Sequence, residues 1–368
     1  MSVNSATISA GDALEVLTEA WRAQIEAGLT TSWMLHGKPG VGKTQLVQTL
    51  ADQIGAELFD IRLTTIEPQD LRGLPYYDHD TQKTLWYRPE DLPDRPGKPA
   101  ILFLDELTAA SPYLQPTVYG LLQERRVGRH SLPDSVLIVA AGNTVEDGAI
   151  AYEMGTALSD RLVHLHVKAN AKDWLERYAV DQSLHPVVTT FLRARPDLLD
   201  TTEDSLRRGD MITCTPRSWE RVSQILHSIS DRRIRDIMVA GTIGRAAGAD
   251  LGRVADELDS VITVDELLAT SRGKRASLYP TTMNGLVGLI YGLVTQADKA
   301  SLPDIIDVMA DIRTLRSSDV AALPLGELTS FGFELLIRKA LSNGLEDAFR
   351  DSKAYAEYAQ DRRAAGAL

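Results

Sequence analysis

A glycine-rich segment at residues 36–44 has the residue types and spacing of a phosphate-binding loop. It fits the pattern G-x-x-x-x-G-K-[ST], in which glycines let backbone N–H groups turn inward toward an anion. In this pattern Lys43 reaches the β- and γ-phosphates of a nucleotide, and the Thr44 hydroxyl is a ligand of Mg²⁺. The helix expected directly after the loop adds the positive end of its dipole to the same site.

The flanks of this segment are those that a phosphate-binding loop requires. Residues 32–35 are short and apolar, as in a buried strand, and residues 44–54 carry apolar side chains at helical spacing. The order is therefore strand, glycine loop and helix. The residues expected to contact the nucleotide are Gly37, Pro39, Gly40, Val41, Gly42, Lys43, Thr44 and Gln45.

Two carboxylates end a second apolar strand, at residues 100–106. Asp105 at the strand end can hold Mg²⁺, usually through water, and Glu106 can polarise the water that attacks the γ-phosphate. Asp105 follows Lys43 by 62 residues, which leaves room for a helix, a strand, an insertion and the return strand. We therefore expect Thr44 and Asp105 to bind the metal and Glu106 to be catalytic.

A polar amide ends a third buried strand, at residues 135–143. Asn143 lies where a residue on a neighbouring strand could hydrogen-bond the γ-phosphate or the attacking water. Asn after Gly is also a common turn residue at the end of a strand. The context favours the catalytic role.

The elements that position these groups can be outlined from residue patterns. Residues 8–28 predict an amphipathic helix in which Trp21 is a core residue rather than a platform for base stacking, and residues 57–63 alternate as a strand. The proline-rich residues 64–99 fit a hairpin insertion with two aromatic arms and a polar tip, or else a surface loop with its aromatic side chains tucked in. Residues 162–167 predict a strand with His164 and His166 on one face, which we expect to be exposed rather than metal-binding.

From residue 171 onward the patterns are helical. Residues 171–180, 186–193 and 218–228 are amphipathic, and helices continue over 232–366. Thr215 and Pro216 are a cap and a first helical residue, which sets Arg217 in the first turn of a helix. A cation there opposes the helix dipole, and a bound phosphate would offset this cost. We expect the basic run at 271–275 to be a solvated loop, with contact to nucleic acid as the less favoured alternative.

Composition limits the classes of function. The net charge of −12 argues against non-specific binding to nucleic acid, which depends on a basic face. Cys214 is the single cysteine, so no internal disulfide can form. No apolar run is long enough to span a bilayer, and the polar start lacks the pattern of a signal peptide. We expect a cytoplasmic protein that does not enter a membrane.

Together these motifs resemble the AAA+ ATPases, and among them most closely the MoxR and dynein-related group. The resemblance is carried by residues 37–44, 67–73, 102–106, 158–162 and 215–218. It implies that Asn143 is sensor 1, that Arg161 is the arginine finger reaching a neighbouring subunit's nucleotide, and that Arg217 is sensor 2. Arg125 and Arg126 remain alternatives for the finger.

The resemblance also implies a fold. It is an α/β P-loop core with a parallel sheet over residues 1–170, with an insert hairpin near 70–90. An α-helical lid begins over 171–232, and the remainder of the lid and a C-terminal helical extension occupy 233–368. The insert lines the central pore in this group.

The function implied is hydrolysis of ATP, with Mg²⁺, by a homo-oligomeric ring that is most often a hexamer. By resemblance such a ring remodels or activates a client protein or complex, often with a partner that has a von Willebrand A domain. Two alternatives are a motor on nucleic acid, which the net charge disfavours, and a scaffold switched by ATP with little turnover, which the Asp105–Glu106 pair disfavours.

Overall fold

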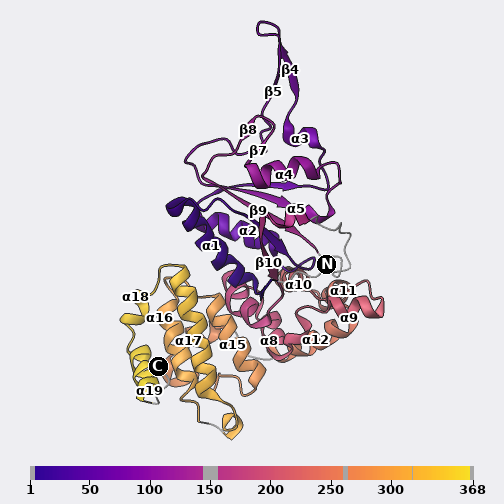
Figure 1. Ribbon diagram of the computed structural model, residues 1–368. Coiled ribbons are helices and arrows are strands. Elements are labelled where there is room, and N and C mark those ends of the chain that lie inside the picture. Colours follow the sequence, from indigo (N-terminus) through magenta and orange to yellow (C-terminus); the bar gives the residue numbers. More distant parts are fainter. Residues whose placement is uncertain (1–4, 144–155, 260–263, 317, 365–368) are drawn as a thin grey trace. The chain divides into compact units, whose positions relative to one another are not determined.

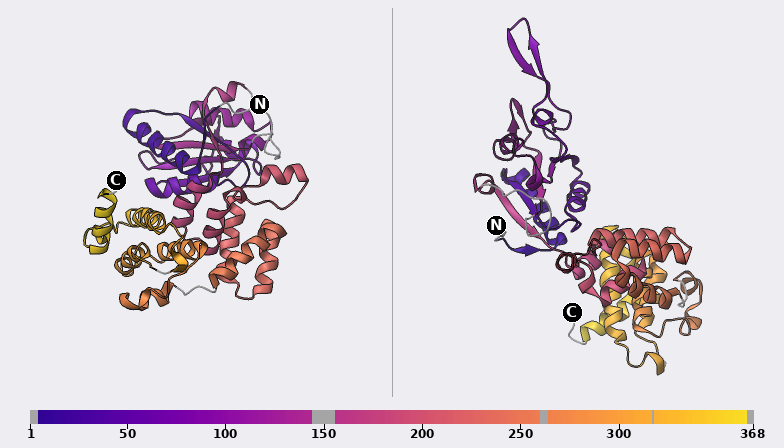
Figure 2. Two further views of the ribbon diagram at one scale, coloured as in Figure 1. Left: turned by 90° about the horizontal axis from the view of Figure 1, so that it is seen from below. Right: turned by 90° about the vertical axis from the view of Figure 1, so that its right-hand side faces the viewer.

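The computed structural model describes residues 5–143, 156–259, 264–316 and 318–364. The chain divides into two compact units, residues 1–170 and 171–368 (Figures 1 and 2). The first unit is an α/β unit and the second is helical. In the described parts of the chain, no helix has the length and apolar character needed to cross a membrane.

The first unit is built on a parallel sheet. Its described strands follow the spatial order β1-β10-β2-β9-β6-β3, and every neighbouring pair is parallel. The strands are β1 (Thr7–Ile8), β2 (Ser32–His36), β3 (Glu57–Arg62), β6 (Ala100–Asp105), β9 (Val136–Gly142) and β10 (Leu162–Val167). The predicted α/β class with a parallel sheet followed by helices is confirmed.

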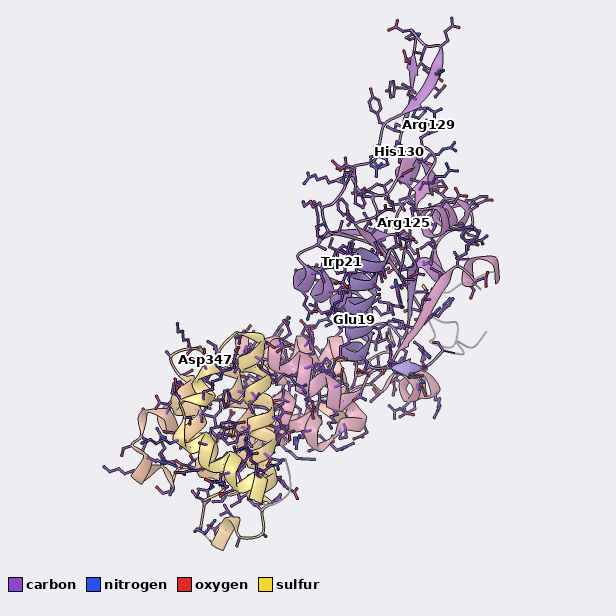
Figure 3. The ribbon with its side chains drawn as sticks, turned by 60° about the vertical axis from the view of Figure 1, so that its left-hand side comes forward. Glu19, Trp21, Arg125, Arg129, His130 and Asp347 are labelled. Carbon is purple, nitrogen blue, oxygen red and sulfur yellow. The ribbon has the colours of Figure 1, made fainter. Side chains whose placement is uncertain are left out.

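Helices cover both faces of this sheet. Helices α1 (Ala10–Ala27) and α2 (Lys43–Ile54) pack on one face, where Leu17, Leu46 and Phe103 belong to one buried cluster. Trp21 is partly buried against this cluster, as its helical position predicts (Figure 3). Helices α4 (Gln115–Glu124) and α5 (Thr156–Ser159) cover the opposite face, where a second cluster contains Met34.

Of the two structures expected for the proline-rich residues 64–99, a hairpin or a surface loop, the structure contains the hairpin. A short helix α3 (Pro68–Arg72) leads into β4 (Pro75–Asp78), which pairs antiparallel with β5 (Lys83–Trp86) (Figure 1). The rings of Tyr76 and Tyr87 stack 4.3 Å apart, and the Arg72 guanidinium lies 4.6 Å from the centre of the Trp86 ring. The aromatic side chains are not all tucked in, because Tyr77 is 73% exposed. A second small hairpin joins β7 (Arg126–Val127) to β8 (His130–Ser131).

The second unit is helical throughout its described part. Its longer helices are α8 (Pro186–Ala194), α9 (Thr202–Arg208), α10 (Pro216–Ser228), α11 (Arg232–Ile243), α12 (Arg245–Asp259), α13 (Val264–Ala269), α15 (Met283–Thr295), α16 (Leu302–Ile312), α17 (Leu325–Ser342) and α19 (Lys353–Ala364). Shorter helical turns are α6 (Ala171–Asp173), a π-helical turn (Trp174–Tyr178), α7 (Ala179–Asp181), α14 (Arg272–Arg275) and α18 (Asp347–Arg350). The apolar helix α15 lies in the largest buried cluster of this unit.

Two predictions for this unit have opposite outcomes. The cap of α10 is confirmed, because Thr215 Oγ1 accepts a hydrogen bond from the Ser218 N–H at 3.1 Å and Pro216 is the first helical residue. The prediction of a solvated basic loop at 271–275 is wrong about the conformation, although residues 271–274 are exposed as expected. Residues 272–275 form helix α14, in which Arg275 alone is buried, at 6% exposed, and donates to the Thr270 carbonyl, whereas Arg272 and Lys274 are exposed.

Candidate nucleotide-binding site

The predicted groups meet at one edge of the parallel sheet. Strands β2, β9 and β6 are neighbours, and all three run in the same direction. The carboxyl ends of parallel strands lie at the same edge, so the segments that follow them come together. These segments are the glycine loop after His36, Asn143 after β9, and the Asp105–Glu106 pair at the end of β6.

The glycines of the loop are required by its geometry. A Cβ at Gly37 would lie 2.5 Å from the carbonyl oxygen of Val167, so a side chain there would collide with backbone. Gly40 and Gly42 have φ of +82° and +104°, in the left-handed region that favours glycine. Helix α2 then begins at Lys43, which points its first N–H groups toward the loop.

Among the other predicted contacts, Val41 is buried and Thr44 is half-buried in the first turn of α2. Pro39 and Gln45 are exposed.

Lys43 is the centre of the hydrogen bonding in the loop. Its side chain is buried, at 9% exposed for the residue, and Nζ donates to the carbonyl oxygens of Gly37 at 2.5 Å and Lys38 at 3.1 Å. It also donates to Oδ1 of Asn143 at 3.0 Å. Lys43 and Asn143 are 100 residues apart in sequence, so the sheet has brought two of the predicted site residues into direct contact.

A threonine that the sequence analysis missed supports Asn143. The backbone N–H of Asn143 donates to Oγ1 of Thr108 at 3.0 Å, and Thr108 is buried. A Cβ at Gly142 would lie 2.6 Å from the same Oγ1, so the glycine allows the threonine to approach the strand. The one signal for this contact in the sequence is that Thr108, a residue with a hydroxyl group, follows the Asp105–Glu106 pair by two positions.

The acidic pair is held in an unusual backbone geometry. Asp105 is 8% exposed, and its Oδ1 accepts a hydrogen bond from the backbone N–H of Glu106 at 2.8 Å. Glu106 is half-buried and has φ of +59°, a left-handed conformation that is uncommon outside glycine. Strained backbone of this kind clusters at functional sites.

Two further residues contact the carboxylates and were also missed. Both belong to β3 or follow it, and β3 lies next to β6 at the edge of the sheet. The hydroxyl of Thr64 donates a hydrogen bond to Oε2 of Glu106. The Arg62 guanidinium lies 3.7 Å from Oε1 of Glu106 and 4.0 Å from Oδ2 of Asp105. Local sequence patterns could not identify them, because they depend on which strand lies beside β6.

Negative charge accumulates at this edge of the sheet. The pKa of Asp60 on β3 is raised, first by burial and then by the negative charge of Asp105, while Arg62 acts in the opposite direction. A hard divalent cation with oxygen ligands suits such a place, and the Thr44 hydroxyl and Asp105 carboxylate are donors of the type that Mg²⁺ prefers. In the described residues no three His, Cys, Asp or Glu side chains form a cluster able to hold a metal by themselves.

Arg161 lies at the other end of the strands. It precedes β10, whose first residue Leu162 pairs with Ser32 at the start of β2, whereas the glycine loop follows the end of β2. The rise of a strand puts about 16 Å between these two levels. The chain therefore does not bring Arg161 to its own phosphate-binding loop.

Arg125, which is labelled in Figure 3, and Arg126 differ in what their side chains contact. Arg125 is turned into its own chain: Nη2 donates to the carbonyls of Pro133 at 3.0 Å and Val136 at 2.5 Å, and burial lowers the pKa of the guanidinium. Arg126 is exposed and pairs with Glu124 at 2.7 Å. Arg217 belongs to the second unit, where it is exposed in the first turn of α10.

The prediction that the two histidines of β10 are exposed is wrong. His164 and His166 share a face of the strand but are half-buried, not exposed, because the face carries the cluster under α4 and α5. His164 Nδ1 lies 2.8 Å from Nε2 of His36, the residue before the glycine loop.

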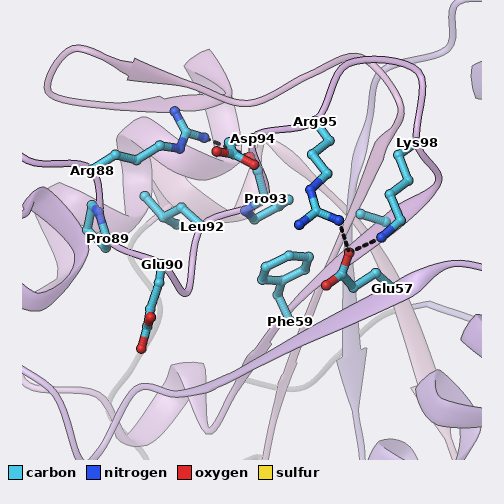
Figure 4. A pocket seen from close by; sticks show the side chains of 11 residues that line it. Glu57, Phe59, Arg88, Pro89, Glu90, Leu92, Pro93, Asp94, Arg95 and Lys98 are labelled. Atoms are coloured by element: carbon cyan, nitrogen blue, oxygen red, sulfur yellow. Dashed lines mark hydrogen bonds and ion pairs between the residues drawn. The ribbon is translucent and has the colours of Figure 1, made fainter.

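A cavity of about 280 Å³ lies away from these groups (Figure 4). It is formed between the start of β3 and the segment that returns to β6, with Phe59 and Leu92 among its lining residues. Glu57 at its edge pairs with Lys98 at 2.5 Å and with Arg95 at 3.9 Å. Since Glu57 begins β3, this cavity is at the opposite end of the strands from Asp105 and is not part of the candidate site.

Comparison with known proteins gives a consistent result for the first unit. Residues 32–162 match the profile of the AAA domain (dynein-related subfamily). The ATPase family gene 2 protein homolog B of Bos taurus is 34% identical over 115 residues, which are 31% of this chain and 12% of that protein. The uncharacterized protein YeaC of Bacillus subtilis (strain 168) is 30% identical over 164 residues, 42% of this chain and 49% of that protein.

These matches cover less than two thirds of either relative's length. Among solved structures, the RuvB Holliday junction branch migration motor of Thermotoga maritima aligns at 15% identity with a TM-score of 0.36, covering 71% of this chain and 74% of that chain.

Proposed function

We propose, since residues 32–162 match the AAA domain (dynein-related subfamily), that the chain hydrolyses ATP in a ring of like subunits and uses the energy to remodel a client protein. The observation that carries the proposal is the contact between Lys43 and Asn143 beside the Asp105–Glu106 pair. It unites a phosphate-binding cation, a polar amide and two carboxylates at one sheet edge, which are the groups that phosphoryl transfer to water needs.

Each group has a proposed role in binding or orientation. The N–H groups of residues 37–44 and the ammonium of Lys43 bind the β- and γ-phosphates, and Asn143 orients Lys43 through their shared hydrogen bond. Thr44 and Asp105 would hold Mg²⁺, which neutralises charge that develops on the phosphates. Glu106 accepts a hydrogen bond from the attacking water and orients it in line.

The position of Arg161 supports the ring. Because Arg161 lies about 16 Å along the strands from the loop of its own chain, it can act on a nucleotide only when another subunit presents one to it. An arginine supplied in trans contributes about 10³–10⁵ in rate. Arg126 is the second choice for this role. Arg125 is disfavoured, because its guanidinium is held by backbone carbonyls of its own chain.

The remaining parts of the proposal rest on likeness to the subfamily. We propose that the helical unit is the lid, that Arg217 acts as sensor 2, that the ring is a cytoplasmic hexamer, and that a protein with a von Willebrand A domain presents the client. The net charge of −12 favours a protein client over nucleic acid.

The test is the substitution Glu106→Gln, which removes the charge that orients water and keeps the shape of the side chain. We expect the variant to bind ATP with wild-type affinity in calorimetry, to assemble as the wild type does in sedimentation, and to release phosphate at least about a hundredfold more slowly. Glu19→Gln, on the exposed face of α1, is the matched control and should leave turnover unchanged. Phosphate release by Glu106→Gln at the wild-type rate would refute the proposal.

A further inference from the structure

Two histidines from neighbouring strands form a hydrogen-bonded pair inside the first unit. His36 Nε2 and His164 Nδ1 are 2.8 Å apart, and their rings are stacked with centroids separated by 5.0 Å. His36 is 6% exposed, so little water can replace this bond if it is lost. None of the roles proposed above uses either ring.

The surroundings determine which nitrogen carries each proton. His164 Nε2 lies 2.8 Å from the carbonyl oxygen of Ser159, which can only accept a hydrogen bond, so Nε2 of His164 carries a hydrogen. In the neutral ring Nδ1 is then bare and accepts from His36, whose Nε2 must carry the hydrogen. The hydrogen bonds therefore run in one direction, from His36 to His164 to Ser159.

The two ends of this chain of bonds lie at different functional segments. His36 is covalently joined to Gly37, whose carbonyl accepts a hydrogen bond from Lys43 and which leaves no room for a Cβ beside the Val167 carbonyl. Ser159 ends α5, two residues before Arg161, whose N–H donates to the Leu158 carbonyl at 3.1 Å. The bonds thus connect the phosphate-binding loop at one end of the strands with the turn that holds Arg161 at the other.

We infer that His36 and His164 are positioning residues that couple the phosphate-binding loop of one subunit to the Arg161 turn that it presents to the next. A displacement of Gly37 moves His36, and the two directional bonds carry that displacement to Ser159 and so to Arg161. This inference rests on the proposed trans role of Arg161. It adds a route by which the nucleotide state of one subunit sets the activity of its neighbour.

The side chains offer substitutions that break or keep individual bonds. Leucine has a volume close to that of histidine and no donor or acceptor, so His36→Leu and His164→Leu break the connection with little change in packing. His36→Gln keeps an N–H near the position of Nε2, and His164→Asn keeps an acceptor near Nδ1 but loses the bond to Ser159. His130→Leu, a half-buried histidine of the β7–β8 hairpin, is the control.

We expect both leucine variants to bind ATP within about twofold of wild type while kcat falls about tenfold or more. His36→Gln should regain most of the lost kcat, and His130→Leu should keep it. The double variant His36→Leu/His164→Leu should be no slower than the slower single variant, because the two rings act as one unit. A side chain that only fills space would not give this rescue or this lack of additivity.

Mixed rings test whether the histidine pair positions Arg161 for the neighbouring subunit. Subunits with Lys43→Ala cannot use ATP but still offer Arg161, so they should stimulate wild-type neighbours, whereas Lys43→Ala/His164→Leu subunits should stimulate them less. Equal stimulation by the two donors, or loss of ATP affinity in step with kcat, would overturn the inference. Lys43→Ala/Arg161→Ala donors test the premise alone: if they stimulate as well as Lys43→Ala donors, the proposed trans role of Arg161 fails, whatever the histidine variants do. Should a leucine variant fail to fold, His164→Asn in the same donor gives the same comparison.

Discussion

Nζ of Lys43 lies 3.0 Å from Oδ1 of Asn143, and this hydrogen bond joins the phosphate-binding loop to the end of a different strand. Lys43 begins α2 after the loop that follows β2, and Asn143 follows β9, the neighbour of β2 in the sheet, so a movement of the end of β9 alters the position of the ammonium. Under the proposed function, we expect Asn143 to orient the ammonium of Lys43 on the phosphates rather than to supply binding energy alone.

Asn143→Ala should therefore lower kcat more than ATP affinity. We expect kcat to fall about tenfold to a hundredfold with a change in dissociation constant of less than about threefold. Phosphate release and calorimetry on the same preparation measure the two effects. Asn343→Ala, at an exposed position after α17, is the control. Equal losses of affinity and turnover would assign Asn143 to binding instead.

The hydrogen bond from Thr64 to Glu106 predicts that removing the Thr64 hydroxyl raises turnover, whereas Asn143→Ala lowers it. The hydroxyl stabilises the carboxylate in one orientation and occupies one of its oxygens, which makes it a weaker acceptor for water. Thr64→Val keeps the shape of the side chain and removes the donor, so we expect turnover without a client to rise about two- to fivefold. Thr64→Ser keeps the donor and should behave as wild type, and a valine variant that is indistinguishable from the serine variant would contradict this account.

We expect substitution of Arg125 to lower the stability of the fold and substitution of Arg126 to leave it nearly unchanged. Arg125→Ala leaves the carbonyls of Pro133 and Val136 without their donor, and we expect the free energy of unfolding to fall by about 2 kcal/mol or more. Arg126→Ala removes an exposed ion pair and should change stability by less than about 0.5 kcal/mol. Urea unfolding of both variants makes the comparison. If Arg126→Ala abolishes turnover in assembled rings while Arg161→Ala does not, Arg126 is the trans arginine.

His185 predicts that the second unit loses stability in mild acid. Burial, and after it the charges of His227 and Arg235, lower the pKa of His185 to about 4. The unfolded chain takes up this proton near the ordinary histidine pKa of about 6.5, so the native state is favoured above that pH and loses up to about 3 kcal/mol as pH falls from 6.5 toward 4.

His185→Asn tests this, because asparagine keeps an acceptor for the Val187 N–H at the start of α8 and cannot titrate. Unfolding by urea at pH 7.5, 5.5 and 4.5 should show a smaller loss of stability in acid for the variant than for the wild type. Parallel pH profiles for the two proteins would exclude His185 as the source.

Features that depend on neighbours in sequence were predictable from residues alone. The glycine loop is one, since Gly40 and Gly42 supply positive φ within a few residues of Lys43. The cap at Thr215 and the hairpin of the insertion are others, because a capping bond and a tight strand pair join residues close together in the chain. The ends of the apolar strands also indicated that Asp105, Glu106 and Asn143 belong to one site.

Tertiary structure alone decided what touches these residues. Thr64 contacts Glu106 because β3 lies beside β6, and His36 contacts His164 because β10 lies beside β2. The parallel pairing of β10 with β2 also set Arg161 at the opposite end of the strands from the loop. Such contacts join residues up to 128 positions apart, and hydrogen bonds of this length depend on strand order and register, which no local pattern of residues encodes.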